Sequence, residues 1–183
     1  MSFASVSRYR KIDKTTWAFV TIATIAMDGR LSFSELLQKK EGKNAFVPDI
    51  GIVYEMAHYY FGTRFVPRGP LQWFLLESTA EFLAIKAHRT LSGEDAYTAV
   101  VRNHYKEAVA LGQIVSLDKI QQAEQIGQNY RYRVGPLLLI ALEQYTNERI
   151  VQKTLAELIT NPPVGEVSYL DFRERLKSAG AIC

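Results

Sequence analysis

Two short runs near the start of the chain have the pattern of β-strands, in which β-branched and aromatic residues gather between turn residues. The stronger run covers residues 16–25, and a weaker one covers residues 30–36 after a turn that contains Gly29. Two such runs separated by a glycine-containing turn are typical of a hairpin. The pattern therefore predicts a small β element within residues 1–45.

Residues 46–183 instead show the pattern of amphipathic helices, with apolar residues three and four positions apart. In segment 50–61 this spacing marks one buried face, and Asp49 supplies a start signal. A longer helix is expected to begin at Pro70 and to reach about residue 91, because proline is favoured in a first helical turn. Further helices are predicted at residues 94–111, 117–127, 132–145, 148–160 and 169–178.

The two patterns together predict a mainly α protein with a small β element, an α+β fold. The chain has 183 residues, of which 48% are hydrophobic and 22% charged, enough for one sizeable core. No repeat at a fixed period and no low-complexity stretch interrupts it. We therefore expect a single domain over residues 1–183, with a strand-containing part, 1–45, and a helical part, 46–183.

Charge and cysteine content argue against several classes of protein. The 22 basic and 19 acidic residues are scattered, so the net charge of +3 does not indicate nucleic-acid binding. The single cysteine, Cys183, rules out an intrachain disulfide. The apolar segment 17–27 is shorter than the roughly 20 residues of a membrane-spanning helix, and its β-branched content favours a strand over a signal peptide. No membrane span is predicted, and the compartment and oligomeric state stay open.

Candidate chemistry is concentrated in the predicted helix 50–61. Residues 54–58 read Y-E-M-A-H, one substitution away from the H-E-x-x-H motif. In that motif two histidines four residues apart bind zinc from one helix face, and the glutamate acts as general base. Glu55 and His58 stand at the glutamate and second-histidine positions, and Tyr54 replaces the first histidine. Because one mismatch in five residues is weak by itself, the surrounding sequence decides its meaning.

The surrounding sequence resembles the aminopeptidase N family of gluzincin zinc metallopeptidases. That family reads H-E-x-A-H-Q-W-F-G and then W-L-N-E-G-F-A, where residues 54–62 read Y-E-M-A-H-Y-Y-F-G and residues 74–80 read F-L-L-E-S-T-A. Eighteen residues separate His58 from Glu77, which is the spacing of the family's third ligand. The matching positions include Ala57, His58, Phe61, Gly62, Glu77 and Ala80.

Further segments extend the resemblance to most of the chain. The family's G-A-M-E-N loop, which recognises the amino end of a substrate, is similar to residues 25–29, where Met27 is identical and Asp28 replaces the glutamate. The resemblance therefore makes Met27 and Asp28 candidate substrate-binding residues. The family's Y-x-x-G sequence before an apolar helix is similar to residues 132–135, and the closing segment is similar from Tyr169 onward.

The resemblance implies a thermolysin-like gluzincin catalytic domain, of which this chain holds the helical C-terminal part and the last strands of the N-terminal lobe. It assigns zinc binding to His58 and Glu77. It assigns the role of general base to Glu55 and the stabilisation of the oxyanion to Tyr132. Because the family's large N-terminal β domain is missing, we expect either a fragment of a longer protein or a lineage that has lost this domain.

The departure at Tyr54 bears directly on metal binding. A phenol with a pKa near 10 must lose its proton before it binds zinc strongly, whereas a neutral imidazole binds directly. Two strong protein ligands rather than three remain, so zinc is expected to be weakly bound or absent.

Three functions stay open at this point. The first is a degenerate zinc-metallopeptidase homologue, aminopeptidase-like, with impaired or absent hydrolysis, acting as a binding module for a peptide or a protein N-terminus. The second is an active zinc-dependent aminopeptidase that uses Glu55 as general base and Tyr132 as oxyanion stabiliser, with Tyr54 or an outside group completing the metal shell. The third is an unrelated helical interaction domain.

Overall fold

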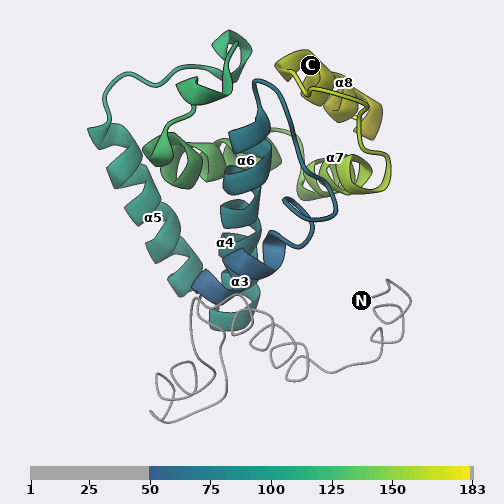
Figure 1. The fold of residues 1–183 in the computed structure, drawn as a ribbon. Helices are drawn as coiled ribbons and strands as arrows, with labels where there is room; N and C mark the ends of the chain where they lie inside the picture. The colour runs from purple at the N-terminus through teal and green to yellow at the C-terminus, as the bar shows by residue number, and fades with distance from the viewer. Residues whose placement is uncertain (1–49, 182–183) are drawn as a thin grey trace, which may run out of the picture. The chain divides into compact units, whose positions relative to one another are not determined.

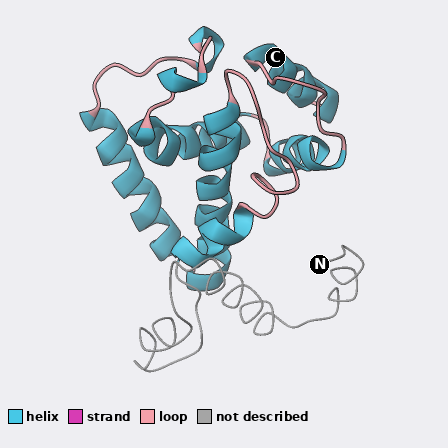
Figure 2. Cartoon of the chain, viewed as in Figure 1, coloured by secondary structure: helices cyan, strands magenta, loops and turns pink. Residues whose placement is uncertain are grey.

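Helices account for most of the part of the chain that the computed structural model describes, residues 50–181 (Figure 1). Figure 2 shows these residues as helices joined by loops, and none of them forms a strand. The α-helices are α3 (Ile50–Ala57), α4 (Thr79–Ser92), α5 (Glu94–Ala110), α6 (Gly135–Tyr145), α7 (Glu148–Thr160) and α8 (Tyr169–Ala179). The mainly helical prediction is confirmed for this part, whereas the predicted strands lie outside the described residues.

Four shorter elements connect these helices. Two are π-helical and lead directly into α4 and α6: η2 (Phe74–Ser78) and η5 (Tyr130–Val134). Two are short 3-10 helices between α5 and η5: η3 (Leu117–Lys119) and η4 (Ala123–Gln125). The long helix predicted from Pro70 is therefore present, but its first turns are π-helical.

Capping explains where the last two helices begin. Asn147 accepts a hydrogen bond from the N–H of Ile150 at the start of α7, and Ser168 accepts one from the N–H of Asp171 at the start of α8. Both helices begin at the predicted residues, because a side-chain oxygen satisfies a backbone N–H that has no partner within the helix. Helix α7 ends before the prolines of residues 162–163, which cannot continue a helix.

Two of the predicted helices are wrong in part or in whole. The first ends at Ala57 rather than near Phe61, because the chain turns at residues 58–60. The helix predicted at residues 117–127 is replaced by η3 and η4. Its buried residues are three positions apart: Ile120, Ala123 and Ile126. Ile120 and Ile126 directly follow η3 and η4 and have non-helical backbone, so the two turns do not join into one helix.

Helix α4 is central to the packing and contacts α5, α6 and η2. Its buried face includes Phe82 and Ile85, and further contacts join α6 to α7 and α7 to α8. Residues from Val53 onward belong to one compact unit, and the single domain over the whole chain stays a prediction. Within the described residues, no helix is both long enough and apolar enough to cross a membrane.

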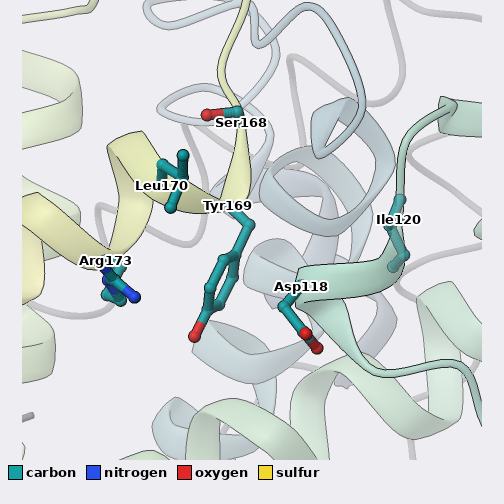
Figure 3. A pocket seen from close by; sticks show the side chains of 6 residues that line it. All are labelled: Asp118, Ile120, Ser168, Tyr169, Leu170 and Arg173. Atoms are coloured by element: carbon teal, nitrogen blue, oxygen red, sulfur yellow. The ribbon is translucent and has the colours of Figure 1, made fainter.

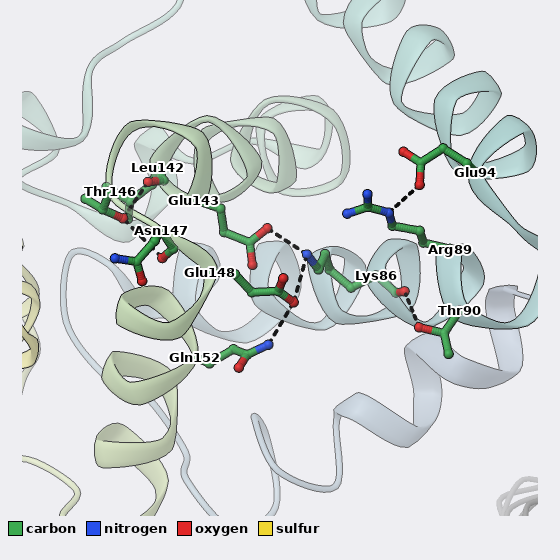
Figure 4. A network of polar contacts seen from close by, with 10 residues as sticks. All are labelled: Lys86, Arg89, Thr90, Glu94, Leu142, Glu143, Thr146, Asn147, Glu148 and Gln152. Atoms are coloured by element: carbon green, nitrogen blue, oxygen red, sulfur yellow. Dashed lines mark hydrogen bonds and ion pairs between the residues drawn. The ribbon is translucent and has the colours of Figure 1, made fainter.

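A partly buried group of charges joins α4 to α6 and α7 (Figure 4). The Nζ atom of Lys86 lies 2.9 Å from Oε2 of Glu143 and 3.1 Å from Oε1 of Glu148. Burial disfavours the charge of the lysine, but the hydrogen bonds to these two carboxylates outweigh burial and raise the pKa of Lys86. The lysine therefore stays charged and ties the three helices together on one side of the core.

The two π-helical segments have hydrogen bonds that are one residue longer than those of an α-helix. In η2 the N–H of Thr79 donates to the carbonyl of Phe74, and in η5 the N–H of Gly135 donates to the carbonyl of Tyr130. Each segment inserts one extra residue into a turn, which rotates the side chains before it relative to the helix that follows. Such insertions are frequent at functional sites.

Pro136 gives a physical reason for the π-helical turn of η5. In an α-helix the N–H of this residue would donate to the carbonyl of Tyr132, but proline has no N–H and its ring crowds that carbonyl. The guanidinium of Arg133 donates to the Tyr132 carbonyl instead, at 2.9 Å. The longer hydrogen bond of η5 thus avoids a clash that an α-helix would create.

The two π-helical segments pack against each other, and the contact continues between Ser78 and Gly135. A Cβ atom added at Gly135 would lie 1.9 Å from Oγ and 2.4 Å from Cβ of Ser78, which is fully buried. The backbone of Gly135 is ordinary helix, with φ at −58°. Glycine is therefore required here by space and not by backbone conformation.

We expect Gly135→Ala to lower the free energy of unfolding by about 1–3 kcal/mol or more, because the added methyl group pushes η2 and η5 apart. Urea denaturation followed by circular dichroism would measure this change. Gly127→Ala is the matched control, since no atom lies within 4 Å of the added Cβ and no positive φ is involved. Equal stability of both variants would contradict the close packing of Ser78 on Gly135.

Candidate functional site

Tyr54 and His58 lie side by side at the end of α3. The N–H of His58 donates to the carbonyl of Tyr54 at 3.3 Å, so the two residues are one helical turn apart. Their rings meet edge to face, with centroids 4.6 Å apart. The four-residue spacing in the sequence predicts this neighbourhood, because residues four apart share a helix face.

Two more residues of the predicted site reach this pair from the π-helical segments. The hydroxyl of Tyr54 donates a hydrogen bond to Oε2 of Glu77, in η2. The hydroxyl of Tyr132, in η5, donates to the same oxygen at 3.2 Å. We call Tyr54, His58, Glu77 and Tyr132 the Tyr54 cluster. It brings together three elements that are far apart in the sequence.

His58 completes the cluster through both of its ring nitrogens. Nδ1 lies 3.0 Å from the carbonyl of Phe61, which can only accept, so Nδ1 carries a proton. Nε2 lies 3.4 Å from Oε2 of Glu77. Burial lowers the pKa of His58, but the contact with Glu77, the Phe61 carbonyl and the charges of Glu77 and Glu55 outweigh it, so the pKa is raised.

The carboxyl group of Glu77 is held in its charged form. Burial raises the pKa of Glu77, but the hydrogen bonds from His58, Tyr54 and Tyr132 and the charge of His58 outweigh it, so the pKa is lowered. Burial raises the pKa of Tyr54, and the hydrogen bond to Glu77 raises it further. Tyr54 is therefore a neutral donor and Glu77 a charged acceptor at neutral pH.

The other predicted site residues have different positions. Glu55 is half-buried on α3, and its charge is one of those that raise the pKa of His58. Met27 and Asp28, predicted to bind the amino end of a substrate, lie outside the described residues. The structure therefore brings together four of the predicted residues and sets Glu55 on the same helix as Tyr54.

Glu81 illustrates a contact that sequence reasoning missed. It lies four residues after Glu77, a spacing that would direct both side chains toward one helix face. In the structure its Oε1 instead lies 3.0 Å from Nε2 of His104, which is buried on α5. No spacing rule could find this pair, because it depends on how α4 and α5 pack. The same holds for the packing of Ser78 on η5.

The donor atoms of the Tyr54 cluster fit a zinc site only in part. Nε2 of His58 and Oε2 of Glu77 are 3.4 Å apart. Two ligand atoms bonded to a tetrahedral zinc ion at about 2.0–2.1 Å lie roughly 3.3 Å apart. The bond from His58 Nδ1 to the Phe61 carbonyl is also the orientation that zinc-binding histidines adopt.

The third donor of the cluster does not fit. Tyr54 stands where the resemblance expects a histidine, and its hydroxyl directs its proton at Glu77, one of the two remaining donors. Across residues 50–181, no three side chains of the histidine, cysteine, aspartate or glutamate type are arranged to hold a metal ion. A catalytic zinc ion needs three protein ligands and one open position, and this donor set supplies two.

No family model, no curated protein and no solved structure matches this chain. The resemblance to the aminopeptidase N family therefore stays an expectation from the sequence, and the structure adds only the geometry of the site. That geometry is the convergence of Tyr54 and Tyr132 on one oxygen of Glu77, with His58 beside it.

We expect Tyr54→Phe to lower the free energy of unfolding by about 1.5–3 kcal/mol, the usual contribution of a hydrogen bond to a charged group. The ring of the variant still packs against His58, so the loss reports the hydroxyl alone. Urea denaturation of the full chain would measure it. Tyr145→Phe is the control, because Tyr145 is 81% exposed and its hydroxyl is in water. If Tyr54→Phe is no less stable than Tyr145→Phe, the hydrogen bond to Glu77 does not hold the cluster together.

Proposed function

We propose that this chain is a degenerate zinc-metallopeptidase homologue of the aminopeptidase type, in which peptide hydrolysis is impaired or absent and the domain acts as a binding module. The observation that carries the proposal is the hydrogen bond from Tyr54 to Glu77. At this position a catalytic gluzincin has a histidine bound to zinc. Here the same position holds a neutral phenol that donates a hydrogen bond to Glu77, which stands at the position of the third ligand.

The convergence of the cluster supports descent from a thermolysin-like gluzincin domain. The resemblance names two ligand positions, His58 and Glu77, and an oxyanion-stabilising position, Tyr132, from three separate elements. These residues meet at one carboxylate oxygen, and the separation of the two donor atoms is the one that a shared tetrahedral ion requires.

The chemistry of the cluster supports the loss of hydrolysis. Zinc-dependent hydrolysis needs a metal ion that lowers the pKa of a bound water molecule and a general base that takes its proton. With two strong donors the affinity for zinc falls steeply, since even the loss of supporting hydrogen bonds around a zinc site costs about 10- to 100-fold. Glu55 keeps the position of the base, but without a metal-bound water it has no proton to remove.

Binding is the activity that such a domain retains. The packed core around α4 and the contact between η2 and η5 support a stable surface on which a ligand could bind. The resemblance makes the amino end of a peptide or protein the first ligand class to consider. This part of the proposal depends on the fold family and not on a metal ion.

We expect Tyr54→His to bind about one zinc ion per chain, because the change restores the third ligand beside His58 and Glu77. The native chain, treated in parallel with zinc and dialysed, is expected to retain little or none. Zinc content per chain, measured by plasma mass spectrometry on folded protein, would show the difference. Tyr54→Phe is the matched control, since it removes the hydroxyl without adding an imidazole.

Two outcomes would contradict the proposal. One zinc ion per native chain, together with cleavage of an aminoacyl reporter substrate, would favour an active aminopeptidase. Failure of a folded Tyr54→His variant to bind more zinc than Tyr54→Phe would show that the cluster does not have the geometry of a zinc site.

A further inference from the structure

A cleft of about 450 Å³ lies between η3 and the first turn of α8 (Figure 3). Ligand pockets in proteins typically have volumes of about 300–1,000 Å³. None of the residues that line the cleft belongs to the Tyr54 cluster. They are Asp118, Ile120, Ser168, Tyr169, Leu170 and Arg173.

Arg173 has hydrogen-bond donors to spare. Its Nε atom is buried and has no hydrogen-bond partner within the described part of the chain. Its guanidinium lies 3.7 Å from Oε1 of Glu174, but the same oxygen is closer to Nζ of Lys177, at 3.0 Å. The Arg173 side chain as a whole is 39% exposed, so the terminal nitrogens of its guanidinium, rather than the buried Nε, are open to an acceptor that enters the cleft.

Two other polar groups of the cleft, those of Asp118 and Ser168, already have partners. The carboxylate of Asp118 accepts a hydrogen bond from Ser116 at 2.5 Å and forms an ion pair with Lys119 at 3.5 Å. Ser168 is occupied by the cap of α8, where it bonds to Asp171. An acceptor that enters the cleft therefore finds its hydrogen-bond donor in Arg173. The carboxylate of Asp118 keeps lone pairs that can accept a hydrogen bond from an N–H of the ligand.

Each side of the cleft also carries an apolar side chain. Ile120 lies on the η3 side, and Leu170, which is 59% exposed, lies on the α8 side. The ring of Tyr169 extends between Arg173 and Asp118 in Figure 3. A ligand that fits this arrangement has an anionic end for the guanidinium and an apolar body for the side chains.

We propose that this cleft binds a carboxylate with an apolar body, such as the C-terminal residue of a peptide. The carboxylate pairs with Arg173, the apolar body packs on Tyr169 and Leu170, and the amide N–H donates to Asp118. A free monocarboxylic acid has the carboxylate and the apolar body but lacks the amide N–H. The proposal does not depend on the ancestry of the Tyr54 cluster.

Titration of the full chain with N-acetyl-L-leucine, followed by NMR chemical shifts, tests the proposal. We expect saturable binding with shifts centred on the first turn of α8, and no saturable binding of N-acetyl-L-leucinamide, which lacks the carboxylate. Hexanoate separates the two sources of the ligand. If hexanoate binds as tightly as N-acetyl-L-leucine, the site takes a free monocarboxylic acid. If hexanoate binds more weakly, the site takes the C-terminal residue of a peptide. Both results support a carboxylate site.

Variants locate the binding site. We expect Arg173→Gln to weaken the binding of N-acetyl-L-leucine about tenfold or more, since it removes a charge-assisted hydrogen bond. Leu170→Asp, which changes an exposed residue and so preserves the fold, is expected to weaken it by adding negative charge at the rim. Arg102→Gln, on an exposed position of α5, is the control and should bind as the native chain does.

Three results would overturn the proposal. The first is equal binding of N-acetyl-L-leucine and N-acetyl-L-leucinamide, because the carboxylate would then have no role. The second is unchanged binding by both Arg173→Gln and Leu170→Asp. The third is the absence of saturable binding by N-acetyl-L-leucine to the native chain.

Discussion

The hydrogen bond from the Tyr54 hydroxyl to the Glu77 carboxylate connects the elements that form the candidate site. It links α3 to η2, and Tyr132 extends the link to η5 through the same oxygen. Hydrogen bonds to a charged acceptor are stronger than those between neutral groups, and partial burial strengthens them further. A zinc ion would join the same elements through bonds to its ligands. Under the proposed function, these hydrogen bonds join the elements in place of a metal ion.

The position of Glu77 and Tyr132 depends in turn on the two π-helical segments. An extra residue in each segment sets the direction in which its side chains point, and Pro136 favours the longer turn in η5. The close approach of Ser78 to Gly135 then fixes one segment against the other.

Much of the site could be predicted from the sequence, because its parts are local or have a fixed spacing. Tyr54 and His58 are four residues apart, so they share one helix face. The helical pattern around Glu77 predicts that it lies on the next helix along the chain. The rest depends on tertiary packing. The apolar spacing does not predict η2, and Pro136 is a local cause only for η5. The pairing of Glu81 with His104 requires knowing how α4 meets α5. The sequence pattern does not distinguish the 3-10 turns after α5 from an α-helix, because apolar residues three positions apart are typical of an α-helix as well.

A crystal structure of the native chain grown with zinc, with anomalous data at the zinc absorption edge, tests the central claim most directly. We expect no anomalous peak between His58 and Glu77, and the Tyr54 hydroxyl within hydrogen-bonding distance of the Glu77 carboxylate. A strong peak bound by His58, Glu77 and a deprotonated Tyr54 would contradict the claim, because the tyrosine would then be a metal ligand and not a replacement for the metal.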